Sequence, residues 1–444
     1  MPSADSRSLP ALGVGIVWVR GLEALLEPRA ALVDAIEVEP QTLWIEEPAS
    51  RERYHLERGA FARLRALRQA KLVHGVGFPV GGTLAPDPLH LPALRASIET
   101  LAAPWASEHL AFNRFALGEG TARAAGAAAY TGFLLPPHQS AAGVEAAAGS
   151  IRSVAVHLPV PFAVETGVNY LRPRAGELSD GAFIAAVAQA ADCGILLDLH
   201  NLWCNQRNGR ARVADVIRQL PLERVWEIHV AGGMERNGYW LDAHSGTVPR
   251  EVLDLAAEIV PLLPNLRAIV FEILATFVSS VGVEAIAAQL RRLREIWGTR
   301  GTRRGFGRDL AGMAGNARST ARETPAEWER ALGSLVIGRD AEGALARELS
   351  ADPGVELLRE LVRDFRAGMV AGTMPRTVRA LLEDGRARAR MLIEAFWQTR
   401  PPQLFGSSEA RAFAEFLEEL PRVSPRVREL AAEECARIAA LTAR

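Results

Sequence analysis

The chain has 444 residues, of which 49% are hydrophobic and 23% charged, and its formal net charge is -1. This composition is typical of a globular protein with a sizeable core, and it excludes a disordered, collagen-like or fibrous chain. The near-neutral charge gives no indication of nucleic-acid binding or of an acidic tail. Three cysteines, Cys193, Cys204 and Cys435, are too few for a disulfide framework, so a reducing, cytoplasmic location is expected. We recognise no signal peptide and no stretch near the ~20 apolar residues of a membrane span, so no membrane association is expected.

Eight short apolar runs alternate with segments of helical periodicity in the first two thirds of the chain. Ser179 is expected to cap one helix, which ends before Gly194, and Pro249 lies near the start of another. Eight such β–α repeats in about 250 residues predict a (β/α)8 TIM barrel over residues 10–297. An open, doubly wound sheet is disfavoured by the strand number and by the lack of G-x-G-x-x-G after the first strand. The predicted strands are 12–16, 35–39, 71–77, 105–110, 162–166, 194–200, 224–230 and 266–273.

The composition changes after the predicted barrel. Residues 298–323 are rich in Gly and Arg and lack an apolar period, which predicts a flexible linker. The sequence Thr324-Pro325-Ala326-Glu327 then has the form of a capping box with proline at the first helical position. Residues 324–444 are therefore predicted to form a small all-α domain. Its expected apolar positions are Val355, Leu358, Leu361, Val362, Phe365, Val378, Leu381, Leu382, Leu392, Phe396, Phe413, Phe416 and Leu417.

Histidine marks the part of the chain that carries chemistry, because all nine histidines lie between His55 and His244. In a TIM barrel the active site is built at the C-terminal ends of the strands and in the loops that follow. Imidazoles and carboxylates occupy those positions, which favours iron, zinc or manganese over a thiolate site. Their number indicates two or three metals, or one metal with many outer groups, and no Ser or Cys stands beside a base as a nucleophile would. The candidates are His74, Glu108, His109, Glu165, Asp198, His200, His229, Asp242, His244 and Glu272.

Other polar residues of the same region are less specific. Glu37 and Glu39 share one face of the second predicted strand, and Glu37 is expected in the outer shell of the site. The remaining histidines are expected to lie in helices or loops with structural roles. They are His55, His90, His138 and His157.

Seven motifs occur in order: HGVG at 74–77, SEHL at 107–110, Glu165 followed by Asn169-Tyr170, CGILLDLHN at 193–201, EIHVAG at 227–232, LDAH at 241–244 and FE at 271–272. Together they resemble the multinuclear non-haem iron TIM-barrel enzymes (MbnB/TglH/ChrH-like) that modify ribosomally made peptides. The resemblance implies two or three irons per chain, dioxygen as co-substrate, and oxidation of a cysteine in a precursor peptide with a leader sequence. It implies the iron ligands His74, His109, Glu165, Asp198, His229, Asp242, His244 and Glu272, with His200, Glu108, Asn169, Asn201 and Glu37 as additional or outer groups.

The chain also departs from the family pattern. The family usually has an A-G-H triplet where this chain has Ala231-Gly232-Gly233, so one ligand is missing. His200 stands where Asn is common, and it is a candidate for the replacement imidazole. The segment Pro40-Gln41-Thr42 replaces a common Pro-Glu-Asn. These departures leave the number of metals open, and with it a different substrate or a reduced activity.

Residues 374–421 are similar to the helical partner proteins encoded beside such enzymes, which implies a fused domain for recognition of the precursor peptide. A dimerisation or purely structural role is the alternative for this domain. The leading hypothesis for the whole chain is an iron-dependent oxidase of a ribosomal peptide. A divalent-metal sugar isomerase or endonuclease of the xylose-isomerase-like type remains open, as does a metal-bearing scaffold that binds a peptide without catalysis.

Overall fold

The computed structural model describes residues 9–19, 21–26, 31–47, 50–117, 128–302 and 321–442. The chain divides into two compact units, which we describe separately. The barrel unit comprises the described parts of Met1–Trp44, Leu56–Ala111 and Pro136–Pro325. The helical unit comprises those of Ile45–His55, Phe112–Leu135 and Ala326–Arg444.

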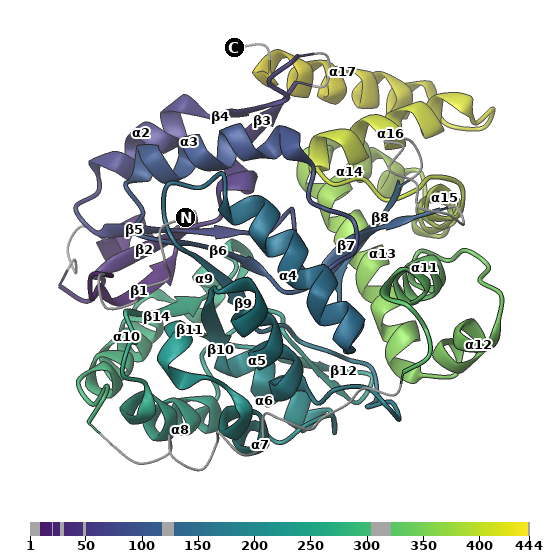
Figure 1. Cartoon of the computed structure of the whole chain (residues 1–444). Coiled ribbons are helices and arrows are strands. Elements are labelled where there is room, and N and C mark those ends of the chain that lie inside the picture. The colour runs from purple at the N-terminus through teal and green to yellow at the C-terminus, as the bar shows by residue number, and fades with distance from the viewer. Residues whose placement is uncertain are drawn as a thin grey trace. The chain divides into compact units, whose positions relative to one another are not determined.

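Eight parallel strands of the barrel unit close into a barrel in the order β1-β14-β11-β10-β9-β6-β5-β2 (Figure 1). All eight predicted strands are confirmed at the expected places in the chain. Apart from Ala70 and His109, which are half-buried, every residue of these strands is buried, as expected for parallel strands that are covered by helices on one face and by the barrel core on the other. The strands are β1 Gly13–Val17, β2 Ala35–Val38, β5 Ala70–Gly75, β6 Ala106–His109, β9 Phe162–Glu165, β10 Gly194–Asp198, β11 Val225–Ala231 and β14 Ala268–Glu272.

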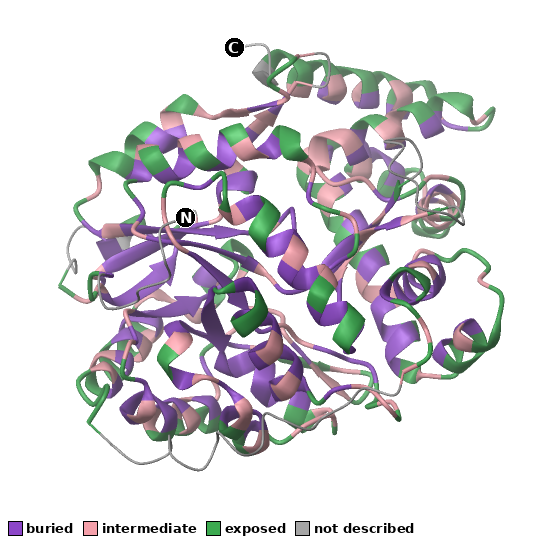
Figure 2. Cartoon of the chain, in the orientation of Figure 1, coloured by how far each residue is buried: buried purple, intermediate pink, exposed green. Residues whose placement is uncertain are grey.

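Amphipathic helices surround the barrel, with buried faces on the strands and exposed faces outward (Figure 2). In α4, for example, Ser140 caps the helix by accepting a hydrogen bond from Gly143 N at 3.0 Å, and Val144, Ala147 and Ile151 are buried. The helices are α1 Glu23–Leu26, α2 Arg58–Ala66, α3 Leu91–Leu101, α4 Ala141–Ala155, α5 Asp180–Ala191, α6 Leu199–Arg207, α7 Val213–Gln219, α8 Arg250–Ile259, α9 Ala275–Val281 and α10 Val283–Trp297. Short 3-10 helices span Pro40–Leu43, Pro88–His90, Leu222–Arg224 and Val260–Leu262, and β12 Met234–Arg236 pairs with β13 Tyr239–Leu241.

Some predicted boundaries were wrong. The side chain of Ser179 precedes α5 but bonds to Gln219 at 2.7 Å instead of capping the helix. That helix ends at Ala191, with Asp192 in the left-handed conformation as its C-cap, and Gly194 begins β10, as predicted. The sixth strand ends at Asp198, whose carboxylate accepts a hydrogen bond from Asn201 N at 2.6 Å and so caps α6. Residues 199–201 therefore form the first turn of a helix rather than the end of a strand.

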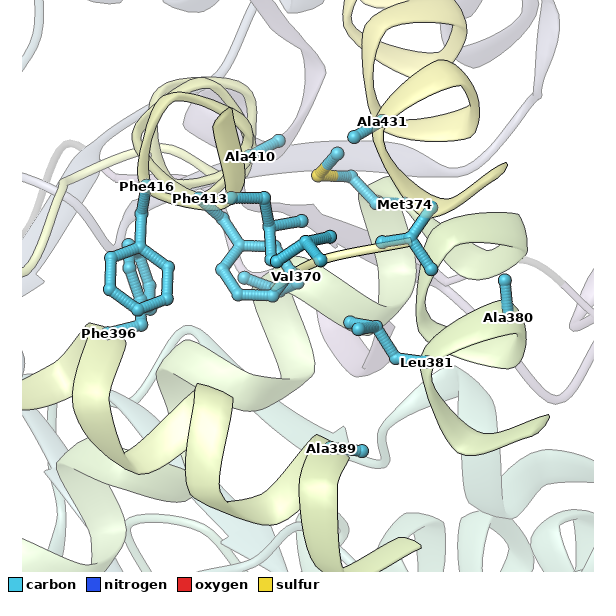
Figure 3. Close-up of a cluster of buried hydrophobic side chains, with 13 residues drawn as sticks. Val370, Met374, Ala380, Leu381, Ala389, Phe396, Ala410, Phe413, Phe416 and Ala431 are labelled. Atoms are coloured by element: carbon cyan, nitrogen blue, oxygen red, sulfur yellow. The ribbon is translucent and has the colours of Figure 1, made fainter. Parts of the chain in front are cut away.

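The C-terminal region is helical, as predicted, and the first of its helices begins at Pro325. Figure 3 shows its apolar core, in which Phe396 of α15 packs against Phe413 and Phe416 of α16, with ring centroids 5.0 and 5.5 Å away. On α13 the predicted apolar face is wrong at one position, because Phe365 is 49% exposed whereas Arg366 is buried. The helices are α11 Pro325–Val336, α12 Ala344–Ser350, α13 Pro353–Thr373, α14 Pro375–Glu383, α15 Arg386–Thr399, α16 Gly406–Glu419 and α17 Pro425–Thr442.

The helical unit also contains two β-hairpins, which the all-α prediction did not include. The first pairs β3 Trp44–Glu46 with β4 Tyr54–Leu56, and the second pairs β7 Phe112–Ala116 with β8 Ala128–Leu135. Glu46 accepts a hydrogen bond from Ser408 Oγ at 2.6 Å, and Tyr54 lies 5.4 Å from the ring of Phe405. These contacts attach segments from the first third of the chain to the C-terminal helices.

Residues 303–320 of the predicted linker lie outside the described residues. Over the part of the chain that the structure describes, no helix has the length and apolar character needed to cross a membrane.

Candidate metal centre

Six barrel strands bring polar side chains to one end of the barrel. The register pairs His109 of β6 with Glu165 of β9, and Asp198 of β10 with His229 of β11. Ala231 of β11 pairs with the last residue of β14, Glu272. Because the strands are parallel, their C-terminal ends meet at one rim, as the sequence predicted.

The first cluster consists of His74, His109 and Glu165. The Oε2 atom of Glu165 lies 3.1 Å from His74 Nε2 and 3.0 Å from His109 Nε2. His109 Nδ1 lies 3.0 Å from the carbonyl oxygen of Gly75, and a carbonyl can only accept, so this nitrogen carries a proton. In neutral His109 the lone pair of Nε2 then faces the carboxylate. Two lone pairs facing each other at this distance require a cation or a proton between them.

The second cluster consists of Glu165, Asp198, His229 and Glu272, whose ligand atoms lie within 4.8 Å of one another. His229 Nδ1 is 3.2 Å from Glu272 Oε1 and 3.8 Å from Glu165 Oε1. Glu165 belongs to both clusters. A third group, Glu37, Glu227 and His229, lies on the other nitrogen of the same imidazole, with Glu37 Oε1 3.0 Å from His229 Nε2.

Several of these atoms lack hydrogen bonds although they are buried. Within the described chain, Glu165 Oε2, Asp198 Oδ2, Glu272 Oε2 and His229 Nδ1 have no hydrogen-bond partner. Such atoms are rare in folded proteins, because an unsatisfied buried polar group is costly. Their short mutual distances without hydrogen-bond geometry fit donors that converge on metal ions.

The shifted pKa values of the clustered side chains indicate that the site favours a positive charge. Burial disfavours the charged form of Glu165, but the imidazoles of His109 and His74 outweigh it and hold the pKa of this carboxyl well below its usual value. Burial likewise opposes charge on His109, yet Glu165 and Glu108 raise its pKa well above the usual value. The pKa of Asp198 is raised well above normal by burial and by the charges of surrounding carboxylates. A bound cation would relieve that repulsion.

The loop residues Asp242 and His244, also predicted as ligands, belong to none of these groups among the described residues, and they lie beside Glu272 at the edge of the second cluster. Asp242 Oδ1 lies 3.1 Å from His244 Nε2, which is 3.4 Å from Glu272 Oε2. His244 has a φ of 45°, an uncommon left-handed conformation for a residue with a side chain. Burial opposes ionisation of Asp242, but His244 and His200 keep its pKa below the usual value.

His200 does not present a free nitrogen to a metal. Its Nε2 lies 3.1 Å from the indole Nε1 of Trp240, which can only donate, so His200 Nε2 must accept. The proton of the neutral imidazole is then on Nδ1, which donates to Asp242 Oδ1 at 3.0 Å. This geometry makes His200 a support for Asp242 rather than the replacement ligand that the sequence suggested.

Gly233 stands where the family pattern has histidine. A Cβ atom at this position would lie 2.3 Å from Leu241 O, 2.4 Å from Trp240 Nε1 and 2.9 Å from His200 Nε2. The hairpin residues Leu241 and Trp240 therefore fill the space that a side chain at 233 would enter.

The remaining predicted residues have supporting roles. Glu108 accepts hydrogen bonds from the backbone nitrogens of Phe78 and His109, at 3.2 and 2.9 Å. Asn169 and Asn201 stabilise the local backbone. Asn169 Oδ1 accepts a hydrogen bond from Leu171 N at 3.0 Å, and Asn201 Nδ2 donates one to Thr166 O at 3.3 Å.

Sequence reasoning placed Glu37 correctly near the site but missed Glu227. Burial raises the pKa of Glu37 to about 7, despite the opposing influence of His229. Glu227 precedes His229 by two residues on β11, so both side chains point to the same side of the strand. A carboxylate inside an otherwise apolar run was the available signal. The histidines expected to be structural, His55, His90, His138 and His157, belong to none of the clusters among the described residues, although His55 lies in strand β4.

A closed parallel barrel with clustered imidazoles and carboxylates at one rim defines a TIM-barrel protein with a candidate metal centre. Residues 15–291 match the family model described as RiPP precursor modification enzyme MbnB/TglH/ChrH, where RiPP denotes a ribosomally synthesised and post-translationally modified peptide. The chain therefore belongs to this family of peptide-modifying enzymes. The matched residues include every predicted metal ligand.

Curated relatives carry the family name UPF0276. One from Streptomyces avermitilis is 33% identical over 254 residues, which are 57% of this chain and 49% of that protein. Another from Chromobacterium violaceum is 29% identical over 229 residues, 51% of this chain and 78% of that protein. The chain thus spans about half the length of the first relative and about three quarters of the second.

Similarity to solved structures is weak. Endonuclease IV from Thermus thermophilus is 16% identical, with a TM-score of 0.39 over 64% of this chain and 99% of that one. D-psicose 3-epimerase from Clostridium cellulolyticum H10 is 14% identical, with a TM-score of 0.39 over 64% and 98%. The barrel assignment rests on the strand order of the chain itself.

Proposed function

We propose that this protein is an iron-dependent oxidase that uses dioxygen to modify a ribosomally synthesised precursor peptide at a cysteine. The observation that carries the proposal is the position of Glu165, which belongs to two buried clusters of imidazoles and carboxylates. Nitrogen and carboxylate donors without thiolate suit iron, zinc and manganese, and a shared carboxylate suits two ions. Membership of a family of peptide-modifying enzymes supports a peptide as the substrate.

One ion would be held by His74, His109 and Glu165, and a second by Glu165 with Asp198, His229 and Glu272. When bound, the irons would supply Lewis acidity and redox chemistry toward dioxygen and a substrate thiol. The space at Gly233 is filled, and His200 Nε2 is engaged by Trp240, so two ions fit the chain better than three.

The protein residues have distinct tasks around these ions. Glu37 lies 3.0 Å from His229 Nε2, where it can fix the ring so that Nδ1 faces Glu165 and Glu272. Deep burial of Asp198 and His229 excludes water from the inner side of the clusters. The side chains of His109, His244 and Asp242 keep 18%, 24% and 15% exposure, so the substrate thiol would approach from their side.

The helical unit would recognise the precursor, including its leader sequence. The candidate ligand groups found among the described residues all belong to the barrel unit, and the histidine of the helical unit, His55, is in none of them. The family match ends at residue 291, so the C-terminal helices are an addition to the matched region. A recognition module fused to the enzyme would raise the effective concentration of the peptide.

Metal analysis and oxygen uptake test the proposal. Protein purified without oxygen should contain two irons per chain and should consume dioxygen with a cysteine-containing precursor encoded by an adjacent reading frame. One zinc, manganese or magnesium per chain, with sugar epimerisation or cleavage of abasic DNA, would instead support the isomerase or endonuclease alternative. Peptide binding without oxygen uptake by iron-loaded protein would refute the oxidase and support a scaffold.

A further inference from the structure

The helical unit contains a cavity of about 400 Å³ that is separate from the metal clusters. It is bounded by the end of α11, one face of α13 and the last turns of α15, which are labelled in Figure 1. Val336, Ile337 and Val362 provide aliphatic wall, and Gly338, with a φ of 77° and open space around it, lies at its edge. A cavity of this size accommodates one or two amino-acid side chains.

Three arginines of α13 line this cavity. Arg359, Arg363 and Arg366 are spaced by four and three residues, so they lie along one face of the helix. Glu394 is the one acidic residue among the lining residues, and its carboxylate accepts a hydrogen bond from Arg390 at 2.8 Å. The lining therefore carries an excess of positive charge.

The three guanidinium groups differ in how far their charge is already compensated. Arg366 is buried, donates to Glu409 at 2.6 Å, and lies 4.8 Å from the centre of the Phe396 ring. Arg359 donates to Leu335 O at 3.0 Å and to Glu356 at 2.7 Å. Arg363 makes no hydrogen bond or ion pair with any described residue. Its charge is the uncompensated one at the cavity.

Of the polar lining groups outside these pairs, Arg363 and Trp397 can only donate hydrogen bonds, whereas the amide of Gln398 can donate or accept. Trp397 lines the cavity next to the buried Phe396 that anchors α15, and its indole nitrogen donates to no described residue. An indole N–H and a guanidinium can only donate hydrogen bonds. A ligand that fits must therefore bring acceptor oxygens, together with an apolar part for the aliphatic wall.

We propose that this cavity binds an aspartate or glutamate side chain of the precursor peptide, with an adjacent aliphatic residue against Val336 and Val362. A carboxylate matches the planar guanidinium of Arg363, and one of its oxygens can accept a hydrogen bond from the indole N–H of Trp397. The inference deepens the recognition role proposed for the helical unit, and it rests on that role for the peptide nature of the ligand. It requires no metal chemistry.

Fluorescence anisotropy on the full-length, iron-loaded protein under anaerobic conditions tests this proposal. The probe is a fluorescein-labelled, terminally blocked octapeptide of alternating Leu and Glu, compared with the same peptide carrying Gln or Lys in place of Glu. The Glu peptide should bind at least about tenfold more tightly than the Gln peptide, as expected for a charge-assisted pair. Inorganic phosphate at about 10 mM should displace it less than twofold if a carboxylate with an aliphatic neighbour is the ligand.

Variants localise the binding. Arg363→Glu should weaken binding of the Glu peptide by about tenfold or more and strengthen binding of the Lys peptide, whereas Trp397→Phe should weaken the Glu peptide by a few-fold. The matched control is Arg386→Glu, which makes the same charge change at an exposed position of α15 outside the cavity and should alter binding less than twofold.

Three outcomes would overturn the inference. The first is that the Glu peptide does not bind at about 1 mM. The second is that Arg363→Glu and Arg386→Glu lower the affinity for the Glu peptide equally. The third is that phosphate displaces the Glu peptide completely. Failure of the proposed oxidase is distinguishable from these outcomes. Protein that binds the Glu peptide but consumes no oxygen refutes only the oxidase, and protein that oxidises a cysteine peptide without binding the Glu peptide refutes only the cavity.

Discussion

Glu165 offers the sharpest test of the metal centre, because it is the one residue common to the two principal clusters. Replacing it with alanine removes one of three donors from the first cluster and one of four from the second. A site with two or three remaining donors in two neighbouring places holds metal weakly, since a stable site uses about three or four protein ligands. We expect Glu165→Ala to reduce bound metal from two ions per chain to fewer than about 0.5. His74→Ala, which affects the first cluster alone, should leave about one ion.

The effect on stability follows from the binding linkage. At a metal concentration about 100 times its dissociation constant, one bound ion stabilises the folded state by roughly 2.7 kcal/mol. For a barrel unit of this size, with an unfolding entropy of about 2.1 cal/mol/K per residue, that corresponds to a rise in Tm of about 4 °C per ion. Wild-type protein should show this rise when metal is restored after chelation, and Glu165→Ala should show almost none.

Elemental analysis and differential scanning calorimetry, each with and without chelator, measure both quantities. Glu258→Ala on the exposed face of α8 is the matched control, because it removes a carboxylate that belongs to none of the clusters. The reasoning would be refuted if Glu165→Ala kept two ions, or if it lost no more metal than His74→Ala. A general loss of folded protein would appear as a lowered Tm in chelator as well.

Three further outcomes are expected. In the metal-free protein the carboxylate neighbours of His109 raise its pKa, so the charged imidazole stabilises the fold below pH ~6.5, and this stabilisation is lost as the pH rises through the raised pKa. The gain in Tm on adding metal, measured by calorimetry, should therefore grow from about pH 6 to about pH 8. A gain in Tm that does not change with pH would contradict this. Glu409→Gln should lower the free energy of unfolding in urea by about 3–5 kcal/mol, because it leaves the guanidinium of Arg366, which is 3% exposed, without its counter-charge. A decrease below ~1 kcal/mol would show that the ion pair is not buried in solution. Gly233→Ala should lower the free energy of unfolding by about 1–3 kcal/mol, because the new Cβ would lie 2.4 Å from Trp240 Nε1. Gly149→Ala in α4 has open space around the new Cβ and should be neutral or stabilising. Equal effects of the two substitutions would show that position 233 is not crowded.

The barrel could be predicted because its local sequence and its fold carry the same signal. Each strand is an apolar run, and a residue such as Glu165 or His229 near its end is conspicuous there. The rule that parallel strands end at one rim then brought distant residues together without any knowledge of contacts. Glu227 was missed because it lies two residues before His229, in the interior of β11 rather than near its end.

The roles of other residues depend on contacts that a sequence does not display. His200 looked like a spare imidazole, and only its approach to Trp240 and Asp242 shows that both ring nitrogens are engaged. Phe365 was assigned to the core by helical periodicity, whereas the buried position belongs to Arg366 because Glu409 lies opposite it. Helical periodicity predicts which face of a helix is apolar, but it does not predict buried ion pairs.

The two hairpins of the helical unit have a consequence for biosynthesis. Glu46 and its partner Ser408 are 362 residues apart, so the ribosome needs roughly 20–70 s at about 5–20 residues per second to make the second after the first. During that interval the hairpin around β3 and β4 has left the ribosome without the helices that cover it. Its unpaired strand edges are then open to association with other chains, so newly made protein should depend on chaperones more strongly than a barrel with no such insertions.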